Sequence, residues 1–377
     1  MSTIRWTETN TPRSAHWHSE SATPPPRRVI VADDRMKADT AYRLACEGTA
    51  LLWRGDFHNA RQLLRAMSRR IDRKPPRRGD SPADSFHLHR RARSHRARVL
   101  GRLLVLLEGD YCLNLRRAPD VRRACTEAYG PPSEPMAVSL TELLGVVGAH
   151  QWRTKGVEVP ALDARVHPRY GVFSPVRGEY VDLVAHAPLP TPADHHMGRR
   201  TAFDLGTGTG VLAAVLARRG IDHIVATDIS PRALACAREN VRRLGFTGRI
   251  DVMGPGLFPD GRADLVVCNP PWIPARPTSA VERGVYDPGS GMLRGFLDGL
   301  TAHLEPGGEG WLILSDLAER LGLRTRGELL AGIEAAGLHV VDRIDTRPRH
   351  PRARDTADPL HAARAAEVTS LWRLAGG

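Results

Sequence analysis

Apolar stretches of two kinds alternate along the chain from Thr201 to its end. Short runs of aliphatic and β-branched residues predict buried strands, at residues 201–205, 223–228, 249–254, 263–269, 310–316, 338–347 and 367–374. Apolar residues spaced three and four apart predict the intervening helices, within residues 206–220, 230–245, 291–308 and 326–337. This alternation predicts an α/β domain with a seven-stranded, mostly parallel sheet that is covered on both faces and binds ligands at the carboxyl ends of its strands.

The first part of the chain has a different pattern. Over residues 41–160, Leu, Ala and Trp recur three and four apart and predict helices, at residues 40–71, 97–115 and 137–152. Residues 1–40 are polar and rich in proline, with no sustained period, which predicts a disordered or loosely attached tail. The sequence thus predicts three parts: the tail at 1–40, a helical domain at 41–160 and the α/β domain at 165–377.

Positive charge is concentrated in the first part. Residues 1–160 hold 28 Lys and Arg against 17 Asp and Glu, whereas residues 161–377 hold 26 against 25. Residues 61–102 alone hold 14 basic and 3 acidic residues. Clustered arginine is typical of surfaces that attract nucleic acid or the ribosome, because it neutralises phosphates. A solvated helical face in an arginine-rich protein has the same composition, so both interpretations stay open at this point.

Other features of the sequence exclude several classes of protein. No apolar run approaches the ~20 residues of a membrane helix, and the N-terminus lacks the apolar core of a secretory signal. The five cysteines form no CxxC pair, so we expect reduced thiols in a cytoplasmic protein, with neither disulfides nor a metal site. We also expect no membrane partner. The sequence carries no signal for an oligomeric state.

A glycine loop follows the first strand of the predicted α/β domain. Gly206, Gly208 and Gly210 stand between a strand and a helix in "FDLGTGTG", where glycine permits a tight turn and a close approach of the backbone to a ligand. A dinucleotide-binding loop has a further glycine three residues after the second, and position 211 is Val. The spacing therefore favours a nucleoside ligand without a pyrophosphate.

An acidic residue ends the second predicted strand. Asp228 lies eighteen residues after Gly210, and a carboxylate there can accept hydrogen bonds from both hydroxyls of a ribose. The alternative is an acid near a helix N-terminus, because Ser230 and Pro231 have the pattern of a helix start. The glycine loop in the preceding strand–helix unit favours the ribose interpretation.

The fourth predicted strand ends in an uncommon tetrad. "DLVVC" leads into Asn269, Pro270, Pro271 and Trp272. Two adjacent prolines cannot donate to a sheet ladder, so the strand must stop there. A turn alone would not require an asparagine and a tryptophan around the prolines. Cys268, beside the tetrad, is expected to be a small buried residue.

Together these segments resemble the class I S-adenosylmethionine-dependent methyltransferases over residues 199–377. The matching motifs are "FDLGTGTG", "ATDIS", "NPPW" and "LEPGGEGWLIL". The resemblance implies a Rossmann-like fold whose last pair of strands is antiparallel to the rest, and S-adenosyl-L-methionine as the cofactor. In the family the glycine loop wraps the methionine and ribose portion, the first acid helps to hold the amino group through the loop, and the second holds the ribose. The residues that the resemblance assigns to the cofactor are Asp204, Gly206, Thr207, Gly208, Gly210, Asp228, Ile229, Leu257 and Asn269.

The tetrad is similar to that of the branch that methylates a nitrogen on a planar group, either the amide of glutamine or the exocyclic amine of adenine or guanine. Such a nitrogen is a poor nucleophile because its lone pair is delocalised. By this resemblance the Asn269 side-chain oxygen and the Pro270 carbonyl each accept one N–H and direct the lone pair at the methyl group. Pro270 and Pro271 keep the loop rigid, and Trp272 stacks on the flat target. No strong general base is required.

A second match precedes the predicted sheet. "GVFSPVRGEYVDLV" resembles the segment ahead of the catalytic domain in glutamine-methylating enzymes and in related ribosomal RNA enzymes of the "methyltransferase small" type. The resemblance implies that residues 165–198 form a lid over the cofactor, with Phe173 and Arg177 as candidate pocket residues. The family pattern is Pro-Arg-x-Glu-Thr. Arg177 and Glu179 match it, whereas Val176 stands in place of the proline and Tyr180 in place of the threonine. Arg177 as a plain surface charge is the alternative.

The adenine end of the cofactor site departs from the family. Relatives commonly carry an aspartate after the third strand to hold the adenine amine, whereas this chain has "GPG" at residues 254–256. Backbone groups and an apolar contact from Leu257 or Phe258 are the expected replacement.

The predicted function is methyl transfer from S-adenosyl-L-methionine to a planar nitrogen of a macromolecule, either protein glutamine or a nucleic-acid base. The expected partner is a ribosomal component, RNA, DNA or protein, with the basic domain at 41–160 as a candidate docking part. A small-molecule N-methyltransferase is one alternative, although it would not need a basic domain. A cofactor-binding module without catalysis is another. Loss of Asn269 or of the glycines would favour that module, and both are present.

Overall fold

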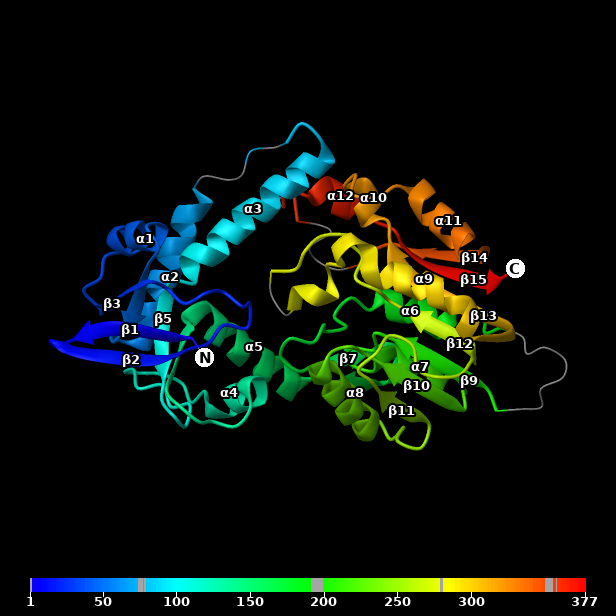
Figure 1. Ribbon diagram of the computed structural model, residues 1–377, viewed down its shortest axis with the longest axis horizontal. Coiled ribbons are helices and arrows are strands. Elements are labelled where there is room, and N and C mark those ends of the chain that lie inside the picture. Colours follow the sequence, from blue (N-terminus) through cyan, green and yellow to red (C-terminus); the bar gives the residue numbers. More distant parts are fainter. Residues whose placement is uncertain are drawn as a thin grey trace. The chain divides into compact units, whose positions relative to one another are not determined.

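The computed structural model describes residues 2–73, 77, 79–190, 199–278, 281–349, 355–356 and 358–377 (Figure 1). The chain divides into two compact units. The N-terminal unit comprises residues 1–79 and 87–151, and the C-terminal unit comprises residues 80–86 and 152–377. Residues 191–198 of the expected lid segment lie outside the described residues.

The N-terminal unit is built around a mixed sheet. Over its described residues, six strands follow the order β1-β2-β6-β5-β4-β3. Their bounds are β1 (Thr3–Glu8), β2 (Thr11–Trp17), β3 (Arg28–Ala32), β4 (Thr49–Trp53), β5 (Leu103–Leu107) and β6 (Met136–Ser139). The helices are α1 (Ala38–Cys46), α2 (Phe57–Asp72), α3 (Pro82–Leu100), α4 (Arg122–Tyr129) and α5 (Leu140–Lys155). The chain passes from one unit to the other within α3 and within α5.

The prediction of a disordered or loosely attached tail at residues 1–40 is wrong. Strands β1 and β2 form an antiparallel hairpin, and β3 pairs with β4. Ile4 and Trp6 are buried on one side of β1, as Ala15 and Trp17 are on β2. The turn residues Thr9 and Asn10 have φ values of 50° and 60°, the positive values of a two-residue hairpin turn. Only two apolar residues per strand carry the alternation, and the polar composition of the segment concealed it.

The prediction of a helical domain at residues 41–160 is also wrong, because the unit is mixed α and β. The apolar runs "TALLW" and "LLVLL", expected within helices, form the strands β4 and β5. All five side chains of β4 are buried. A short apolar run buried on all sides has no period that separates a strand from a helix. Gly48, with φ at 89°, ends α1 and allows β4 to start one residue later.

The C-terminal unit contains the expected α/β sheet. In its described part seven strands follow the order β11-β10-β9-β12-β13-β15-β14. Their bounds are β9 (Thr201–Leu205), β10 (His223–Thr227), β11 (Ile250–Met253), β12 (Ala263–Cys268), β13 (Leu304–Ser315), β14 (Leu338–Thr346) and β15 (Thr369–Gly376). The helices are α6 (Glu179–His186), α7 (Val211–Arg218), α8 (Pro231–Arg243), α9 (Gly291–His303), α10 (Leu317–Arg320), α11 (Arg326–Ala335) and α12 (His361–Ala365). A hairpin of β7 (Val157–Val159) and β8 (Ala164–Val166) precedes them.

The predicted Rossmann-like, mostly parallel sheet is therefore confirmed, with one correction. The last pair of strands was expected to be antiparallel to the rest. β15 is antiparallel to both β13 and β14, so β14 runs in the same direction as β13. Only β15 runs against the other strands of this described sheet.

Two hydrophobic layers cover the two faces of this sheet. Leu265 and Val267 of β12 face one layer, which includes side chains of α6 and α7. Val266 and Cys268 face the other layer, which includes side chains of α9 and α11. With both faces covered, the carboxyl ends of the strands remain the place for a ligand. In the described part of the chain, no helix combines the length and the apolar character needed to cross a membrane.

Candidate active site

The sheet brings the three sequence motifs to one edge. Leu205 at the end of β9 is in register with Thr227 of β10 and with Cys268 of β12. The glycine loop, Asp228 and Asn269 each follow directly after these positions. Because the three strands are parallel neighbours, their carboxyl ends place the three motifs side by side.

The glycine loop adopts a conformation that requires glycine. Gly206, Gly208 and Gly210 have φ values of 70°, 56° and 82°, a region that side chains disfavour. A Cβ on Gly206 would lie 2.4 Å from the Cε of Met292. The Thr207 amide donates to the Thr227 carbonyl at 2.8 Å, which fixes the loop against β10.

Asp204 supports this loop from beneath. Its side chain is buried, and Oδ2 accepts hydrogen bonds from Thr207 Oγ1 at 2.6 Å and from the Ala213 amide at 3.0 Å. Burial raises the pKa of Asp204 to about 6, although these two hydrogen bonds oppose the shift. Asp204 therefore connects the loop to the first turn of α7 by accepting hydrogen bonds, and both donors are neutral groups.

Asp228 faces the same loop from the end of β10. Its Oδ2 accepts from the Gly208 amide at 3.1 Å, and its Oδ1 accepts from the Ser230 amide at 2.8 Å. Burial raises the pKa of Asp228. Each carboxylate oxygen can accept a further hydrogen bond, so these contacts leave room for a ligand. Ile229, the next residue, exposes 75% of its surface and presents an apolar side chain at this edge.

The loop after β11 contributes the two apolar residues expected at the adenine end. Phe258 stacks on the ring of His303, with 4.2 Å between ring centroids, and packs against Gly299 of α9. Leu257 is partly buried, and its carbonyl accepts from Thr227 Oγ1 at the end of β10. Leu257 is therefore tied to the strand that carries Asp228, whereas the Phe258 ring is engaged by α9.

The tetrad after β12 is held by an internal hydrogen bond. The indole Nε1 of Trp272 donates to Asn269 Oδ1 at 2.9 Å. This bond fixes the orientation of the Asn269 amide, and its oxygen has a second lone pair to offer. Pro270 is buried, whereas Pro271 is partly buried. Cys268 is fully buried, as expected, and burial raises the pKa of its thiol well above the usual range.

Arg177 lies against this tetrad and is not a plain surface charge. Its guanidinium lies 5.0 Å from the ring centroid of Trp272. It donates to both carboxylate oxygens of Glu367 at 3.1 Å and to Glu179 at 3.2 Å. Glu367 is completely buried and also accepts from Ser315 Oγ at 2.7 Å. A buried acid thus holds the arginine over one face of the tryptophan.

The segment that carries Arg177 crosses the carboxyl edge of the sheet. Val172 packs against Ala233 of α8, and Phe173 lies against Gly284, where an added Cβ would be 2.7 Å from the Phe173 Cβ. The hydroxyl of Ser174 is buried, and no described residue forms a hydrogen bond with it. Buried polar groups normally have a partner. Ser174 is therefore a further candidate site residue, which the sequence did not single out.

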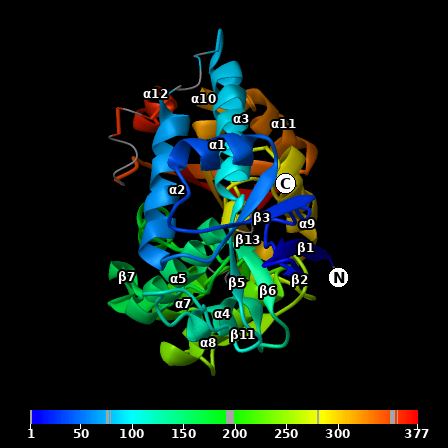
Figure 2. The ribbon, with the colours of Figure 1, turned by 90° about the vertical axis from the view of Figure 1, so that its left-hand side faces the viewer.

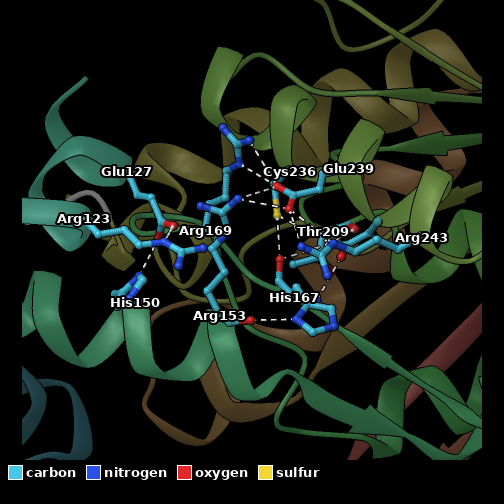
Figure 3. A network of polar contacts seen from close by, with 11 residues as sticks. Arg123, Glu127, His150, Arg153, His167, Arg169, Thr209, Cys236, Glu239 and Arg243 are labelled. Carbon is cyan, nitrogen blue, oxygen red and sulfur yellow. Dashed lines mark hydrogen bonds and ion pairs between the residues drawn. The ribbon is translucent and has the colours of Figure 1, made fainter. Parts of the chain in front are cut away.

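A polar network that the sequence did not reveal supports the glycine loop from α8 (Figure 3). Asn240 Nδ2 donates to the Thr209 carbonyl at 2.9 Å, and Asn240 Oδ1 accepts from the His167 amide at 2.9 Å. The neighbouring Glu239 is buried, which opposes ionisation, but hydrogen bonds from its arginine partners lower its pKa to about 2. These partners are Arg153, Arg169 and Arg243. The only signal in the sequence was a pair of polar residues on the buried face of an amphipathic helix.

Among the described residues, no group of three or more His, Cys, Asp or Glu side chains could hold a metal ion.

Comparison with known proteins finds similarity to a family within the C-terminal unit. A family model described as "Methyltransferase small domain" matches residues 163–319. The release factor glutamine methyltransferase of Cereibacter sphaeroides is 38% identical over 173 residues, which are 41% of this chain and 59% of that protein. The ribosomal protein L11 methyltransferase of Pelotomaculum thermopropionicum is 35% identical over 145 residues, which are 38% of this chain and 39% of that protein. The solved structure of a methyltransferase from Pyrococcus furiosus covers 63% of this chain and 99% of its own, with 17% identity and a TM-score of 0.38.

The chain thus spans only about two fifths to three fifths of the length of these two curated relatives. The family match lies wholly within the C-terminal unit. It confirms the resemblance of this unit to the S-adenosylmethionine-dependent methyltransferases.

Proposed function

We propose that this chain is an S-adenosyl-L-methionine-dependent N-methyltransferase whose acceptor is the side-chain amide of glutamine in a protein. The observation that carries the proposal is the position of Asn269, oriented by Trp272, on the strand next to the glycine loop. Both curated relatives are named for methylation of a protein, and one of them for methylation of glutamine.

The residues at the carboxyl edge fit the cofactor. The three glycines with positive φ let the backbone approach a ligand, and Asp228 has unused lone pairs for ribose hydroxyls. The exposed side chain of Ile229 and the nearby Leu257 offer apolar surface to an adenine. Thr207 and Asp204 keep the loop in place. When bound, S-adenosyl-L-methionine supplies an activated methyl group on a positively charged sulfur.

Asn269 and Pro270 supply the acceptor chemistry. The two N–H groups of a glutamine amide donate to Asn269 Oδ1 and to the Pro270 carbonyl, which places the nitrogen at a fixed point and orientation. The two N–H groups become stronger donors as the nitrogen gains positive charge, so their hydrogen bonds to the two oxygens stabilise the transition state more than the ground state. The nitrogen gains a methyl group and then releases one proton to solvent. No general base is needed for this release, because a methylated amide nitrogen that carries a positive charge is strongly acidic.

Arg177 acts as a positioning residue for the tetrad. It lies on one face of the Trp272 ring and is anchored by the buried Glu367. A cation held over an indole face stabilises the ring in place, and the ring in turn holds the Asn269 oxygen. The face of Trp272 that Arg177 covers is therefore closed to a flat acceptor. The lid role of residues 165–190, with Phe173 near the acceptor, is part of the same proposal.

A nucleobase amine is the second candidate acceptor. It offers the same two N–H groups to Asn269 and Pro270, and the positive charge of residues 61–102 favours it. The proposal also includes a ribosomal protein or protein factor as the partner and a cytoplasmic location. A small-molecule acceptor is not favoured, because it would not need the basic segment at residues 61–102. A binding module without catalysis is not favoured, because Asn269 is present and is held by Trp272.

The proposal is tested by incubating the purified chain with methyl-labelled S-adenosyl-L-methionine and separated cell fractions: ribosomes, tRNA, DNA and soluble protein. Label in a protein band that protease removes and nuclease does not is the expected result. Label that nuclease alone removes would transfer the assignment to the nucleobase acceptor. Cofactor binding with no label in any fraction would contradict the enzymatic function itself.

A further inference from the structure

Helix α2 of the N-terminal unit carries a regular row of arginines. Arg61, Arg65, Arg69 and Arg73 occupy every fourth position, with Arg73 as the C-cap. The buried face of the helix lies on the other side and consists of Phe57, Ala60, Leu63 and Met67. At a rise of ~1.5 Å per residue, the four arginines repeat every ~6 Å along a line of ~18 Å. Arg65, Arg69 and Arg73 are exposed.

This row is not neutralised within the part of the chain that the structure describes. The one acid of α2, Asp72, pairs with Arg96 of α3, and the remaining arginine of the helix, Arg70, pairs with Asp39. No described carboxylate forms an ion pair with the four arginines of the row. Like charges four residues apart on a helix repel each other. The helix therefore maintains an unfavourable line of charge that an external anion would relieve.

Helix α3 extends the basic surface. Arg96 of α3 donates to Ser68 and Asp72 of α2, so the two helices lie side by side (Figure 2). No side chain between Phe86 and Val99 is buried, and Arg91, Arg93, His95 and Arg98 are exposed. A hollow of about 440 Å³ opens on this helix, lined by His87, Arg90, Arg91, Ser94, His95 and Arg98. We define the α2–α3 basic surface as the four arginines of the row on α2 together with Arg93 and the α3 residues that line the hollow.

We infer that the α2–α3 basic surface binds the phosphate backbone of a nucleic acid. A guanidinium pairs with phosphate through two parallel hydrogen bonds, and nearly all cations of this surface are arginines. A row with a constant spacing along the helix fits a polymer whose charges also repeat regularly. A single phosphate or a compact anion would need the arginines to converge on one point. The inference goes beyond the proposed function, because it assigns a partner to the other unit of the chain and requires no methyl transfer.

The test is a fluorescence-anisotropy titration of the full chain with labelled single-stranded RNA or DNA of ~20 nucleotides, at several salt concentrations. The variant R65Q/R69Q/R73Q removes the exposed part of the row. The matched control is R43Q/R122Q/R123Q, which removes three exposed arginines of the same unit that have carboxylate partners, Glu47, Asp120 and Glu127. Both triple variants change the net charge equally, and circular dichroism verifies that both are folded.

We expect R65Q/R69Q/R73Q to weaken binding at least ~10-fold and to lower the slope of log affinity against log salt by ~2. The control should change affinity less than ~3-fold. Equal weakening by both variants would show that net charge alone attracts the nucleic acid, and would overturn the inference. Competition by poly-glutamate or anionic vesicles as strong as by unlabelled RNA would overturn it in favour of another polyanion. Equal affinities for RNA and DNA are consistent with recognition of the phosphate backbone. Unequal affinities identify which of the two nucleic acids this surface binds.

Discussion

Two buried aspartates, one in each unit, show how differently the two units use charge. Asp56 in the N-terminal unit caps α2 through the His58 amide and accepts hydrogen bonds from Arg116 and Arg117. The hydrogen bond from Arg117 is the main reason that its pKa lies well below the usual range. Asp204 in the C-terminal unit has only neutral donors, and burial raises its pKa to about 6.

This difference separates a structural carboxylate from the two carboxylates of the proposed cofactor site. Asp56 is neutralised by its own chain and stabilises the fold. Asp204 and Asp228 both have raised pKa values, and repulsion between them contributes to the shift of Asp204. Acids that the protein leaves without a cation are suited to a positively charged ligand. The absence of a cationic partner at Asp204 and Asp228, among the described residues, therefore suits the sulfonium cofactor that we propose.

The largest effect is expected at the acceptor side of that site. Asn269→Ala removes one of two oxygens proposed to orient the acceptor, so we expect the turnover number to fall ~100- to 1,000-fold. The affinity for S-adenosyl-L-methionine should change little, because the glycine loop is untouched. Single-turnover methyl transfer and calorimetric titration measure the two quantities. Asn114→Ala, an exposed asparagine of the N-terminal unit, is the control. An equal loss of affinity and turnover in N269A would contradict the separation of the two roles.

A smaller effect is expected at the glycine loop. Gly206→Ala forces a side chain into a left-handed conformation and against Met292, so the affinity for the cofactor should fall ~10-fold or more. Gly337→Ala is a matched control, since Gly337 has the same φ of 70° with open space around it. Both variants should lose ~1 kcal/mol of folding free energy from backbone strain. Calorimetric titration that shows equal cofactor binding in the two variants would exclude a role for the loop.

The positioning role of Arg177 predicts a still smaller effect. Arg177→Ala should lower the turnover number ~10-fold with an unchanged KM for the cofactor, because the Trp272 ring loses its cover and the Asn269 oxygen loses its fixed orientation. The fluorescence of Trp272 should also respond. Arg54→Ala, which removes a similar contact with Trp6 in the N-terminal unit, serves as the control. A change in cofactor KM alone would place Arg177 in the cofactor pocket instead.

The smallest effects concern stability and its dependence on pH. The depressed pKa of Asp56 contributes stability above its ordinary value of 3.8, and this contribution is lost as the pH falls below that value. The raised pKa of Asp204 contributes stability below 3.8, and this is lost as the pH rises through about 6. At pH ~7 we therefore expect Asp56→Asn to lower the urea midpoint and Asp204→Asn not to lower it. Chemical denaturation at pH ~7 and ~4 checks both signs. A lower midpoint for D204N at neutral pH would contradict the assignment.

The sequence predicted the fold of the C-terminal unit and the loops at its carboxyl edge better than it predicted the N-terminal fold. Particular residue types are required in the loop at Gly206, Gly208 and Gly210 and in the turn at Pro270. Their motifs can therefore be recognised in the sequence. Strands β4 and β5 are runs of apolar residues, and nothing local in such a run separates a strand from a helix.

Contacts between distant positions could not be predicted at all. Glu367 lies 190 residues after Arg177, and Asn240 lies 73 residues after His167. Each becomes a partner only when the sheet is assembled. No period or motif in a single sequence marks such pairs in advance. The positioning of Trp272 and the support of the glycine loop therefore emerged only from the structure.

In the proposed reaction, Asn269 and Pro270 hold the planar amide nitrogen of the acceptor. Mass spectrometry of the methylated protein acceptor, with fragmentation to locate the methyl group, identifies the nitrogen that is modified. We expect the methyl group on the side-chain nitrogen of a glutamine. A methyl group on a lysine or an N-terminal amine would contradict it, because those nitrogens have a localised lone pair and do not require two fixed oxygen acceptors.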